Sequence, residues 1–400
     1  MLSGNDKLKI LVLGTRGIPG IQGGVERHCE QLYPRIAARG HSVFLCTRTP
    51  YVKDKTPFYK GINLIHCYAP RNKSLEAITH TFIGLMRARL ISPDVVHIHA
   101  IGPSLLTPVA RLLGLRVVVT NHGPDYDRQK WGKGAKFILK LGEKLGGLYA
   151  DEVIVISRVI QNIIRTRCHR EAVIIPNGVE FPSQSSRTDF LAKCGLFPGN
   201  YILTVGRFVP EKGFHDLIDA FTGNFTDNFG NFGSDFKLVI AGDADHETPY
   251  SASLREKARQ DKRIVLTGFI TGEELNQIYH HARLFVLPSY HEGLPLALLE
   301  ALSYGLSVLV SDIPAHREIG LSSRRYFHHG NISDLRAKIK LLLKEPLPED
   351  EKQAMMRQIE KRYNWDRIAD QTLDVYRRAI NGGLVSKEIH PCSDKNTIRI

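Results

Sequence analysis

The sequence lacks the features that mark membrane-spanning, secreted or zinc-binding proteins. No apolar run reaches the ~18 residues of a membrane helix, and the mostly polar start from Met1 to Lys9 does not resemble a signal peptide. Six cysteines are scattered over 400 residues without a Cys-x-x-Cys pair. Because disulfide frameworks and structural zinc sites need regular cysteine spacing, neither is expected, and the pattern predicts a reduced, cytoplasmic protein.

A dinucleotide-binding fingerprint is also missing, although a glycine-rich loop invites comparison with one. Gly14, Gly17 and Gly20 are spaced three apart rather than as G-x-G-x-x-G, and the second predicted strand ends at Arg48 without an acidic residue for a ribose. An NADP enzyme is therefore the weaker interpretation. The stronger one is a long glycine-rich loop whose end, Gly23-Gly24, begins a helix that points into a cleft. A surface loop without a special role is the alternative.

Composition is that of a folded, soluble protein with two cores. Hydrophobic residues make up 42% and charged residues 24% of a chain whose length exceeds a usual single core. The formal net charge is +13. A basic protein can bind nucleic acid, but no helix-turn-helix, zinc-finger or RNA-binding signature is present, so nucleic acid is not an expected partner.

Part of the positive charge is concentrated between residues 128 and 147. This stretch carries six cations and one anion, with aromatic and aliphatic residues between them. A basic amphipathic helix of this kind suits an anionic membrane surface, which predicts a possible peripheral contact with the inner face of the plasma membrane. An equally good interpretation is a surface helix whose apolar stripe faces the domain core while its lysines face water.

Alternating apolar runs and helical patterns predict an α/β protein with two doubly wound, Rossmann-like domains. In the first half, strands are expected at 8–13, 43–46, 64–67, 95–99, 117–120 and 152–156, and helices at 25–39, 75–90, 105–113 and 136–149. In the second half, strands are expected at 201–205, 237–241, 264–267, 284–287 and 308–310. The domain boundaries are predicted at 1–180 and 181–364.

The two halves meet at a linker that contains Pro176-Asn177-Gly178 and a serine-rich run from Ser183 to Ser186. A cleft between the domains is a favoured place for a ligand. The segment 381–400 has neither a helical nor a strand period and is predicted to be a disordered tail.

Two glutamates eight positions apart, Glu292 and Glu300, follow the predicted strand 284–287 and flank a helix start. Parallel α/β sheets bind their ligands at this edge. Pro295 suits the first helical position, which leaves Glu292 in the loop and Glu300 one turn into the helix. Because carboxylates repel phosphate, their partners are expected to be the hydroxyl groups that accompany phosphate in a nucleotide sugar. The alternative is an ordinary strand–helix unit with solvated carboxylates.

A second strand, 201–205, runs into Gly206-Arg207, followed by Lys212-Gly213 and a helical pattern. Glycine allows a ligand to approach the backbone closely, and the two cations suit a diphosphate. Taken alone, this segment would more commonly be a Gly-Arg turn with surface charges than a phosphate site. Both segments together predict a site for a nucleoside diphosphate.

In this order, these motifs resemble the retaining GT-B glycosyltransferases of family 4, of the bacterial surface-polysaccharide type. The resemblance runs from about residue 8 to 380 and includes the strand ends Ala241-Gly242-Asp243 and Leu266-Thr267-Gly268-Phe269. It implies a GT-B fold with two domains facing across a cleft, the first on the acceptor side. It also implies that a helix at 365–380 crosses back to the first domain.

The resemblance further implies roles for individual residues. Glu300 would hold the ribose hydroxyls, Arg207 and Lys212 would neutralise the leaving diphosphate, and Glu292 would bind the transferred sugar. The other donor contacts implied are Gly23, Gly24, Gly206, Gly268, Phe269, Ile270, Gly293, Leu294, Pro295 and Leu296. His122 matches a histidine placed near the donor sugar in this family, and Asp125 is its nearest carboxylate in the sequence. His97 and His99, which alternate along one strand, are expected to be core or edge residues.

No metal ion or cofactor is expected beyond the nucleotide sugar itself. Asp243-Ala244-Asp245 superficially offers a magnesium site, but it stands at a Gly-Asp strand end where GT-B enzymes need no metal. Arg207, Lys212 and helix amides can stabilise the leaving group instead.

The predicted reaction moves a hexose, with UDP- or GDP-linked donors favoured, to a hydroxyl of a saccharide or lipid-linked acceptor with retention of anomeric configuration. Two alternatives remain open. One is a nucleotide-sugar epimerase or hydrolase on the same scaffold, and the other is a non-catalytic binding module.

Overall fold

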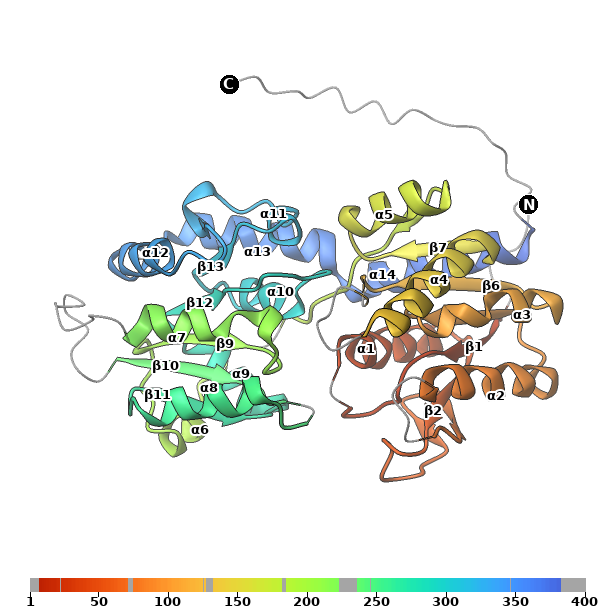
Figure 1. The fold of residues 1–400 in the computed structure, drawn as a ribbon, viewed down its shortest axis with the longest axis horizontal. Helices are drawn as coiled ribbons and strands as arrows, with labels where there is room; N and C mark the ends of the chain where they lie inside the picture. Colours follow the sequence, from red (N-terminus) through yellow and green to blue (C-terminus); the bar gives the residue numbers. More distant parts are fainter. Residues whose placement is uncertain are drawn as a thin grey trace, which may run out of the picture.

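The computed structural model describes residues 7–21, 23–70, 75–124, 126, 132–181, 185–222, 236–244, 246–345 and 347–382. These residues form two α/β units that lie side by side (Figure 1). One holds an eight-stranded sheet in the order β3-β4-β2-β1-β5-β6-β7-β8, and the other a six-stranded sheet in the order β11-β10-β9-β12-β13-β14. All pairings are parallel except β3 with β4, so the predicted pair of doubly wound domains is confirmed.

The N-terminal sheet consists of short apolar strands, most of them buried. Its strands are β1 (Lys9–Leu13), β2 (Ser42–Arg48), β3 (Phe58–Tyr59), β4 (Ile62–Cys67), β5 (Val95–His99), β6 (Val117–Asn121), β7 (Glu152–Val155) and β8 (Val173–Ile174). Its helices are α1 (Gly24–Ala38), α2 (Glu76–Ile91), η1 (Pro103–Leu106), α3 (Thr107–Leu112), α4 (Lys133–Tyr149) and α5 (Arg158–Cys168).

The predicted helix 105–113 was partly wrong, since a 3₁₀ turn, η1, precedes a six-residue α3.

The C-terminal sheet repeats this plan. Its strands are β9 (Tyr201–Val205), β10 (Lys237–Ala241), β11 (Ile264–Gly268), β12 (Leu284–Leu287), β13 (Val308–Ser311) and β14 (Tyr326–Phe327). The helices that follow the linker are α6 (Asp189–Lys193), η3 (Pro210–Lys212), α7 (Phe214–Thr222), α8 (Pro249–Arg259), α9 (Gly272–His280), α10 (Leu296–Ser303), α11 (Pro314–Arg317), η4 (Ser323–Arg325), α12 (Ile332–Lys344) and α13 (Glu349–Tyr363).

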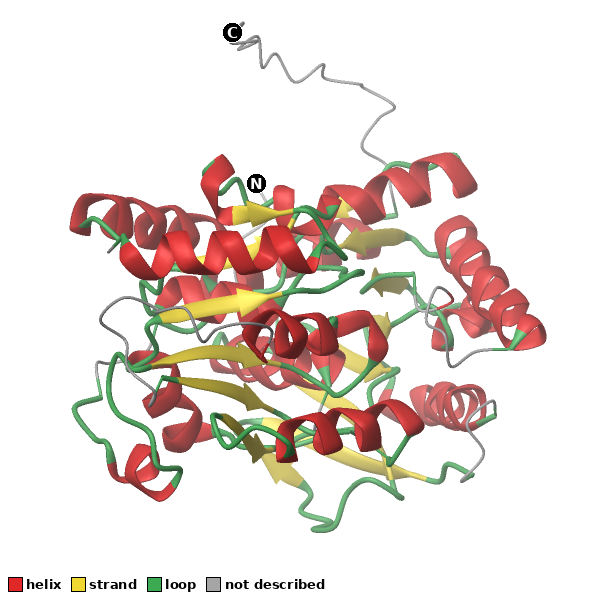
Figure 2. Cartoon of the chain, turned by 60° about the vertical axis from the view of Figure 1, so that its left-hand side comes forward, coloured by secondary structure: helices red, strands yellow, loops and turns green. Residues whose placement is uncertain are grey.

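Figure 2 shows helices on both sides of the strands, which is why strands such as β5 and β12 are buried along their whole length. Parallel sheets covered on both faces have strands that are apolar throughout rather than alternating. The last described helix, α14 (Trp365–Ile380), returns to the N-terminal unit, where its apolar face joins the core formed with α1 and β1. Arg39 fastens it there through Asp370 at 2.6 Å.

Among the described helices, none is both long and apolar enough to cross a membrane. Of the predicted tail 381–400, residues 381 and 382 are described, and the remainder lies outside the described residues.

Candidate functional site

The strand ends of the C-terminal sheet bring a lysine and a glutamate together. Lys212 Nζ lies 2.7 Å from Glu292 Oε1, and the Ser289 hydroxyl donates to the same oxygen at 2.7 Å. Only 11% of the Glu292 side chain is exposed. Burial alone would raise the pKa of Glu292, but the adjacent Lys212 ammonium and the Ser289 hydrogen bond hold it below its ordinary value. The site therefore pairs an ionised carboxylate, that of Glu292, with the side chain of Lys212.

Close backbone packing fixes these two loops against one another. Tyr290 N donates to Glu211 O at 2.8 Å, and a Cβ on Gly213 would lie 2.2 Å from Pro288 O. Gly213 also has φ +64°, so only glycine fits without strain. The turn that carries Arg207 and Lys212 is thereby held beside the loop that carries Glu292.

A third strand end joins them. Gly206 N donates to Ala241 O at 2.9 Å, and a Cβ on Gly242 would lie 2.0 Å from Gly206 O. Gly242 N in turn donates to Gly268 O at 2.9 Å. Gly268 has φ +70° and precedes a 49% exposed Phe269 and a half-buried Ile270. The predicted phosphate and base segments thus lie at one edge of the sheet.

Glu300 lies at the end of the first turn of α10 and is also largely buried. The Tyr279 hydroxyl donates to Glu300 Oε2 at 3.0 Å. Burial raises the pKa of Glu300, and the charge of Arg27 opposes that rise. The Arg27 guanidinium, which lies 3.6 Å from Glu300 Oε1, comes from α1 of the N-terminal domain. The carboxylate predicted for the ribose thus faces the cleft between the domains.

Pro295 departs from its predicted place. It has φ −79° and ψ 101°, an extended conformation, and α10 begins one residue later at Leu296. The proline therefore caps the helix instead of forming its first residue. Leu294 and Pro295 are both buried.

Across the cleft, the loop after β6 meets the Glu292 loop through glycines. A Cβ on Gly293 would lie 2.7 Å from the His122 carbonyl oxygen, and one on Gly123 would lie 3.8 Å from Gly293 Cα. The His122 backbone thus lies against the loop that carries Glu292. Asp125, its predicted companion, lies outside the described residues.

The glycine loop reaches the cleft from α1. The helix begins at Gly24 as predicted, and Gly23 has φ +152°. A Cβ on Gly23 would lie 1.9 Å from a carboxylate oxygen of Glu26, whose other oxygen accepts from Arg16 N at 3.0 Å. Glu26 therefore anchors the loop, while Arg27 next to it points to Glu300.

His122 belongs to a group of four histidines in the N-terminal domain. Its Nε2 lies 2.9 Å from His99 Nδ1, and the His99 Nε2 lies 2.5 Å from the Tyr33 hydroxyl. The same hydroxyl lies 2.9 Å from His97 Nδ1. His28 completes the group, with its ring centroid 4.9 Å from that of His122. Burial lowers the pKa of all four rings, that of His28 to about 4, so they are neutral at pH 7.

Ring nitrogens of His28, His99 and His122 come within 4.8 Å of one another, which makes them the group among the described residues best placed to hold a metal ion. Two nitrogens on one tetrahedral zinc ion would be about 3.3 Å apart. The 2.9 Å between His99 and His122 is instead a hydrogen-bond distance. The cluster therefore fits a hydrogen-bonded network better than a metal centre.

The other possible metal site is incompletely described. Asp243 Oδ1 accepts from Arg255 at 2.6 Å, and Asp245 lies outside the described residues.

Several residues of the site could not be found from local sequence patterns. Tyr279, Ser289, Arg27, His28 and His316 carry no motif of their own. His316 is buried near Glu292, its pKa is lowered to about 4 by burial, and its Nε2 has no partner among the described residues. Arg27 and His28 lie three and four residues after Gly24, in the first turns of the helix that the Gly-Gly pair begins, and this helix start is the signal that could have drawn attention to them.

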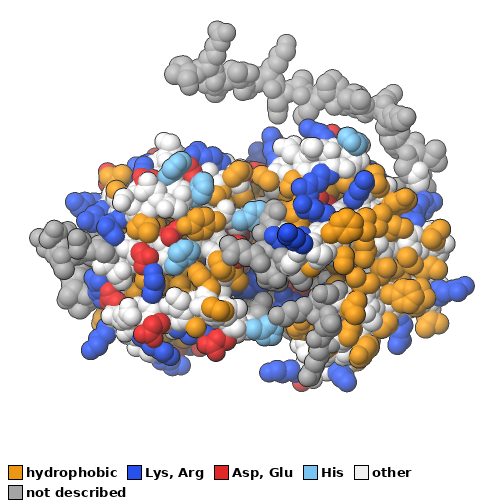
Figure 3. Space-filling view, in the orientation of Figure 1, with side chains coloured by type: hydrophobic (Ala, Val, Ile, Leu, Met, Phe, Trp, Pro, Cys, Tyr) orange, Lys and Arg blue, Asp and Glu red, His pale blue; other side chains and the backbone are white. Residues whose placement is uncertain are grey.

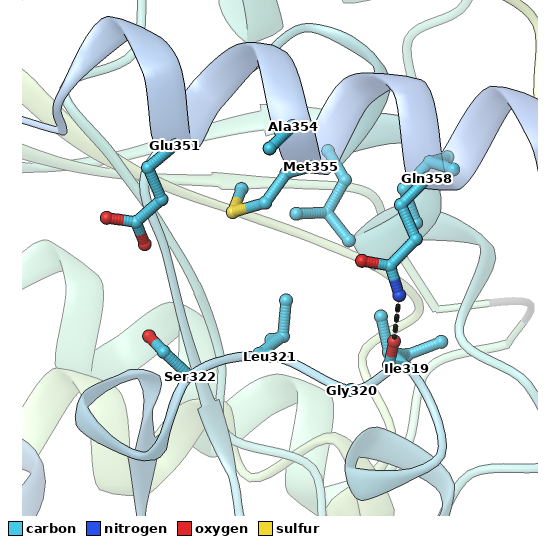
Figure 4. Close-up of a pocket in the computed structure, with 10 residues that line it drawn as sticks. Ile319, Gly320, Leu321, Ser322, Glu351, Ala354, Met355 and Gln358 are labelled. Atoms are coloured by element: carbon cyan, nitrogen blue, oxygen red, sulfur yellow. Dashed lines mark hydrogen bonds between the residues drawn. The ribbon is translucent and has the colours of Figure 1, made fainter.

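A separate cavity of about 160 Å³ lies between α13 and the segment 319–322. Figure 4 shows it spanned at one side by the bond from Gln358 Nε2 to Ile319 O, 3.3 Å long. Its lining is mostly apolar and includes none of the donor-site residues. It is smaller than the ~300 Å³ usual for small-molecule sites and takes no part in the chemistry described here.

Comparison with known proteins agrees with this geometry. The family described as Glycosyltransferase Family 4 matches residues 22–181, and Glycosyl transferases group 1 matches residues 195–363. The teichuronic acid biosynthesis glycosyltransferase TuaC of Bacillus subtilis is 24% identical over 344 residues, 84% of this chain and 78% of the relative. An Escherichia coli UDP-Gal:alpha-D-GlcNAc-diphosphoundecaprenol alpha-1,3-galactosyltransferase is 30% identical over 230 residues, 55% of this chain and 58% of the relative.

Solved structures share the fold. Sucrose-phosphate synthase from Thermosynechococcus elongatus has a TM-score of 0.79 at 21% identity and covers 94% of this chain and 100% of its own. Anabaena Alr3699/HepE in complex with UDP-glucose has a TM-score of 0.73 at 17% identity, with 92% and 99% covered.

Proposed function

Since the chain belongs to family 4 of the GT-B glycosyltransferases, we propose that it moves a hexose from a nucleoside-diphosphate donor to a lipid-linked saccharide, with retention of anomeric configuration. The observation that carries this proposal is the convergence of Lys212, Glu292 and Glu300 at one sheet edge, with His122 facing them from the other domain. Positive charge for a diphosphate and carboxylates for sugar hydroxyls are thereby brought within one cleft.

In the proposed mechanism the bond from the sugar to the diphosphate breaks while charge develops on the leaving oxygen. Lys212 and Arg207 stabilise that charge without a metal ion, and amides at the start of α10 add to their effect. Glu292 accepts hydrogen bonds from the transferred sugar, and a donor phosphate oxygen takes the proton of the acceptor hydroxyl. The pair of flanking carboxylates used by glycosidases is not needed.

The donor site predicts a specific thermal response. One member of a panel of UDP, GDP, ADP, dTDP and CDP should raise Tm, because a ligand that binds only the folded state stabilises it, and EDTA should leave the shift unchanged. Glu300→Ala should weaken binding of that nucleotide about 10- to 100-fold, the effect of losing charge-assisted hydrogen bonds.

Glu256→Ala, which removes an exposed carboxylate of α8, is the matched control. The ribose role is wrong if Glu300→Ala binds like wild type. If no nucleotide shifts Tm, the donor site itself is wrong. Donor consumption without an acceptor would instead indicate a hydrolase or epimerase.

The acceptor proposal is supported by a relative and by a surface. The matching E. coli galactosyltransferase is named for an acceptor attached to diphosphoundecaprenol, which is a lipid carrier. A saccharide of this kind is reached at a membrane, so we place the enzyme on the inner face of the plasma membrane as a peripheral protein.

The structure overturns the simpler interpretation of α4, in which its apolar stripe faces the core. The helix packs inward through glycines: a Cβ on Gly142 would lie 2.1 Å from Ile101 O, and one on Gly147 would lie 2.5 Å from Cys168 Sγ. Five of its large apolar residues are exposed, namely Phe137, Ile138, Leu141, Leu148 and Tyr149, while Leu139 and Leu145 are half-buried.

Helices α2 and α3 extend this surface with Phe82, Met86, Leu90, Leu112 and Leu113, and Figure 3 shows the hydrophobic side chains gathered over this half of the molecule with Lys and Arg among them. The acidic residues of the three helices, Glu76 and Glu143, are buried and paired with Arg48 and Arg167. A surface that combines exposed apolar groups with exposed lysines suits anionic lipid.

Removing two of its exposed cations should weaken membrane binding. With about 1 kcal/mol for each cation near an anionic surface, Lys140→Ser/Lys144→Ser should lower the partition coefficient on phosphatidylglycerol vesicles about 30-fold. Vesicle sedimentation measures it. The control Lys338→Ser/Lys344→Ser removes the same charge from α12 of the other domain and should bind like wild type. Equal losses in both variants, or binding to phosphatidylcholine alone, would contradict this surface.

A further inference from the structure

The chain passes between the domains twice, and the two crossings form one joint. Val179, in the first crossing, donates from its N–H to Tyr363 O at 2.8 Å and pairs with Asn364 in the second. A Cβ on Gly178 would lie only 2.4 Å from the Trp365 ring. Because the crossings are bonded to each other and packed without room for a side chain, a change in the angle between the domains must act through this joint.

His28 of α1 contacts both crossings. Its Nδ1 lies 2.8 Å from the Asn177 Oδ1, and its ring stands edge-on to Trp365 with centroids 5.5 Å apart. All three side chains are at least 95% buried. Since an amide oxygen only accepts, Nδ1 of the neutral ring carries the proton and donates it. The tautomer and orientation of His28 are therefore set by the linker.

On its other side, His28 packs against the cleft. Its ring meets that of His122 at 78° and lies 5.4 Å from the ring of His99. His99 bonds to His122 at 2.9 Å and stacks on it with centroids 5.2 Å apart. Hence His28 and His99 together fix the position of the His122 ring, and only His28 of the two also contacts the joint.

We propose that His28 is a positioning residue that couples the angle between the domains to the placement of His122 beside the donor sugar. Closure of the cleft displaces the linker at Asn177 relative to α1, and His28 passes that displacement to the His122 ring. This inference rests on the proposed function for the role of His122, and it adds a residue and a coupling that the transferase assignment does not require.

His28→Phe tests the coupling, because it keeps an aromatic ring against Trp365 and His122 but removes the bond to Asn177. It should lower kcat about tenfold, the value of a buried hydrogen bond, with donor KM within twofold of wild type. Asn177→Leu removes the same bond from the other side and should give the same loss. The double variant should lose no more than either single variant, as expected for one shared interaction.

Tryptophan fluorescence supplies a measurement that would not change if the role of His28 were merely structural. In a Trp131→Phe background, Trp365 is the sole tryptophan of the chain, and its emission should change when the nucleotide found in the thermal panel is added. The change should be reduced in His28→Phe and in Asn177→Leu, even though the nucleotide still raises Tm. His80→Phe, which replaces another buried histidine of the same domain, should match wild type in both measurements.

Unchanged kcat in His28→Phe, or the same nucleotide-induced emission change in all variants, would overturn the coupling. Should His28→Phe fail to fold, Asn177→Leu alone decides by the same two measurements. If the proposed function itself is wrong, the wild-type protein will show neither a nucleotide-induced Tm shift nor turnover, which distinguishes that failure from failure of the coupling.

Discussion

Lys212→Ala is expected to lower kcat about 100- to 1,000-fold while weakening nucleotide binding less than tenfold. Before donor binds, the Lys212 ammonium is paired with Glu292 at 2.7 Å, so binding the ground state gains little from it. Its charge becomes most valuable when the diphosphate departs and negative charge concentrates on the leaving oxygen. Steady-state kinetics with the donor identified by the thermal panel, together with calorimetry of nucleotide binding, measure the two quantities separately.

The substitution also leaves Glu292 without its ammonium partner, so two controls are needed. Lys257→Ala removes a lysine from an ion pair with Asp219 in the same domain. Neither residue belongs to the donor site, so this variant should leave kcat unchanged. Lys212→Met/Glu292→Gln removes both charges, which separates the loss of the cation from the cost of an unpaired buried carboxylate. A Lys212→Ala enzyme whose kcat stays within fivefold of wild type would remove Lys212 from the mechanism.

Much of the fold could be predicted from the sequence because its strands are short apolar runs with clear ends. Strands such as β9 and β12 are buried on both faces, so nearly every position is apolar and turn residues follow directly. The two-residue strands β3, β8 and β14 were not predicted, since two residues carry no period. Element order then placed Arg207, Lys212 and Glu292 at one edge of the sheet.

The direction in which α4 faces could not be predicted in the same way. Amphipathic periodicity assumes that apolar residues face inward, yet here the buried positions are three glycines and one glutamate, namely Gly142, Glu143, Gly146 and Gly147. Without side chains the glycines let the helix lie directly on the Ile101 backbone and on Ser104, and most of the large apolar residues are turned outward. Only the three-dimensional packing distinguishes these two arrangements of the same pattern.

The contacts at the joint and between the domains could not be predicted from the sequence either. His28 and Asn177 are 149 positions apart, and Arg27 reaches a glutamate of the other domain. Neither pair has local spacing that a helical or strand period could reveal. The family resemblance named residues of each domain separately, and the joint between them follows only from the arrangement of the folded chain.

The four clustered histidines predict that the protein loses stability in mild acid. Burial depresses the pKa of each ring below the value of about 6.5 expected in the unfolded chain. Unfolding then takes up protons once the pH falls below 6.5, so the stabilisation is complete above that pH and is lost progressively toward the folded pKa. For His28, whose folded pKa is about 4, the loss over this window is about 3 kcal/mol.

Among the described residues, the hydrogen bonds of the cluster go to Asn177, Thr120, Tyr33 and Tyr376 or to another histidine, and none of these groups carries a charge that would offset the loss. Protonating one ring also disfavours protonation of the next. The losses from the four rings have the same sign. We therefore expect Tm to fall steeply between pH 6.5 and 5, before carboxylates titrate, and calorimetry across this range measures the fall.

The number of protons that the protein takes up on unfolding identifies the cause of the lost stability better than the size of the fall in Tm does. His28→Asn should reduce the slope of unfolding free energy against pH by up to one proton, about 1.4 kcal/mol per pH unit, whatever it does to stability at pH 7.5. His169→Asn is the matched control, because His169 is exposed at the end of α5 with φ +49°, a conformation that asparagine accepts. It should leave the slope unchanged. Equal slopes in wild type and His28→Asn would mean that His28 is already protonated in the folded protein, and a neutral His28 that donates to Asn177 would then be excluded.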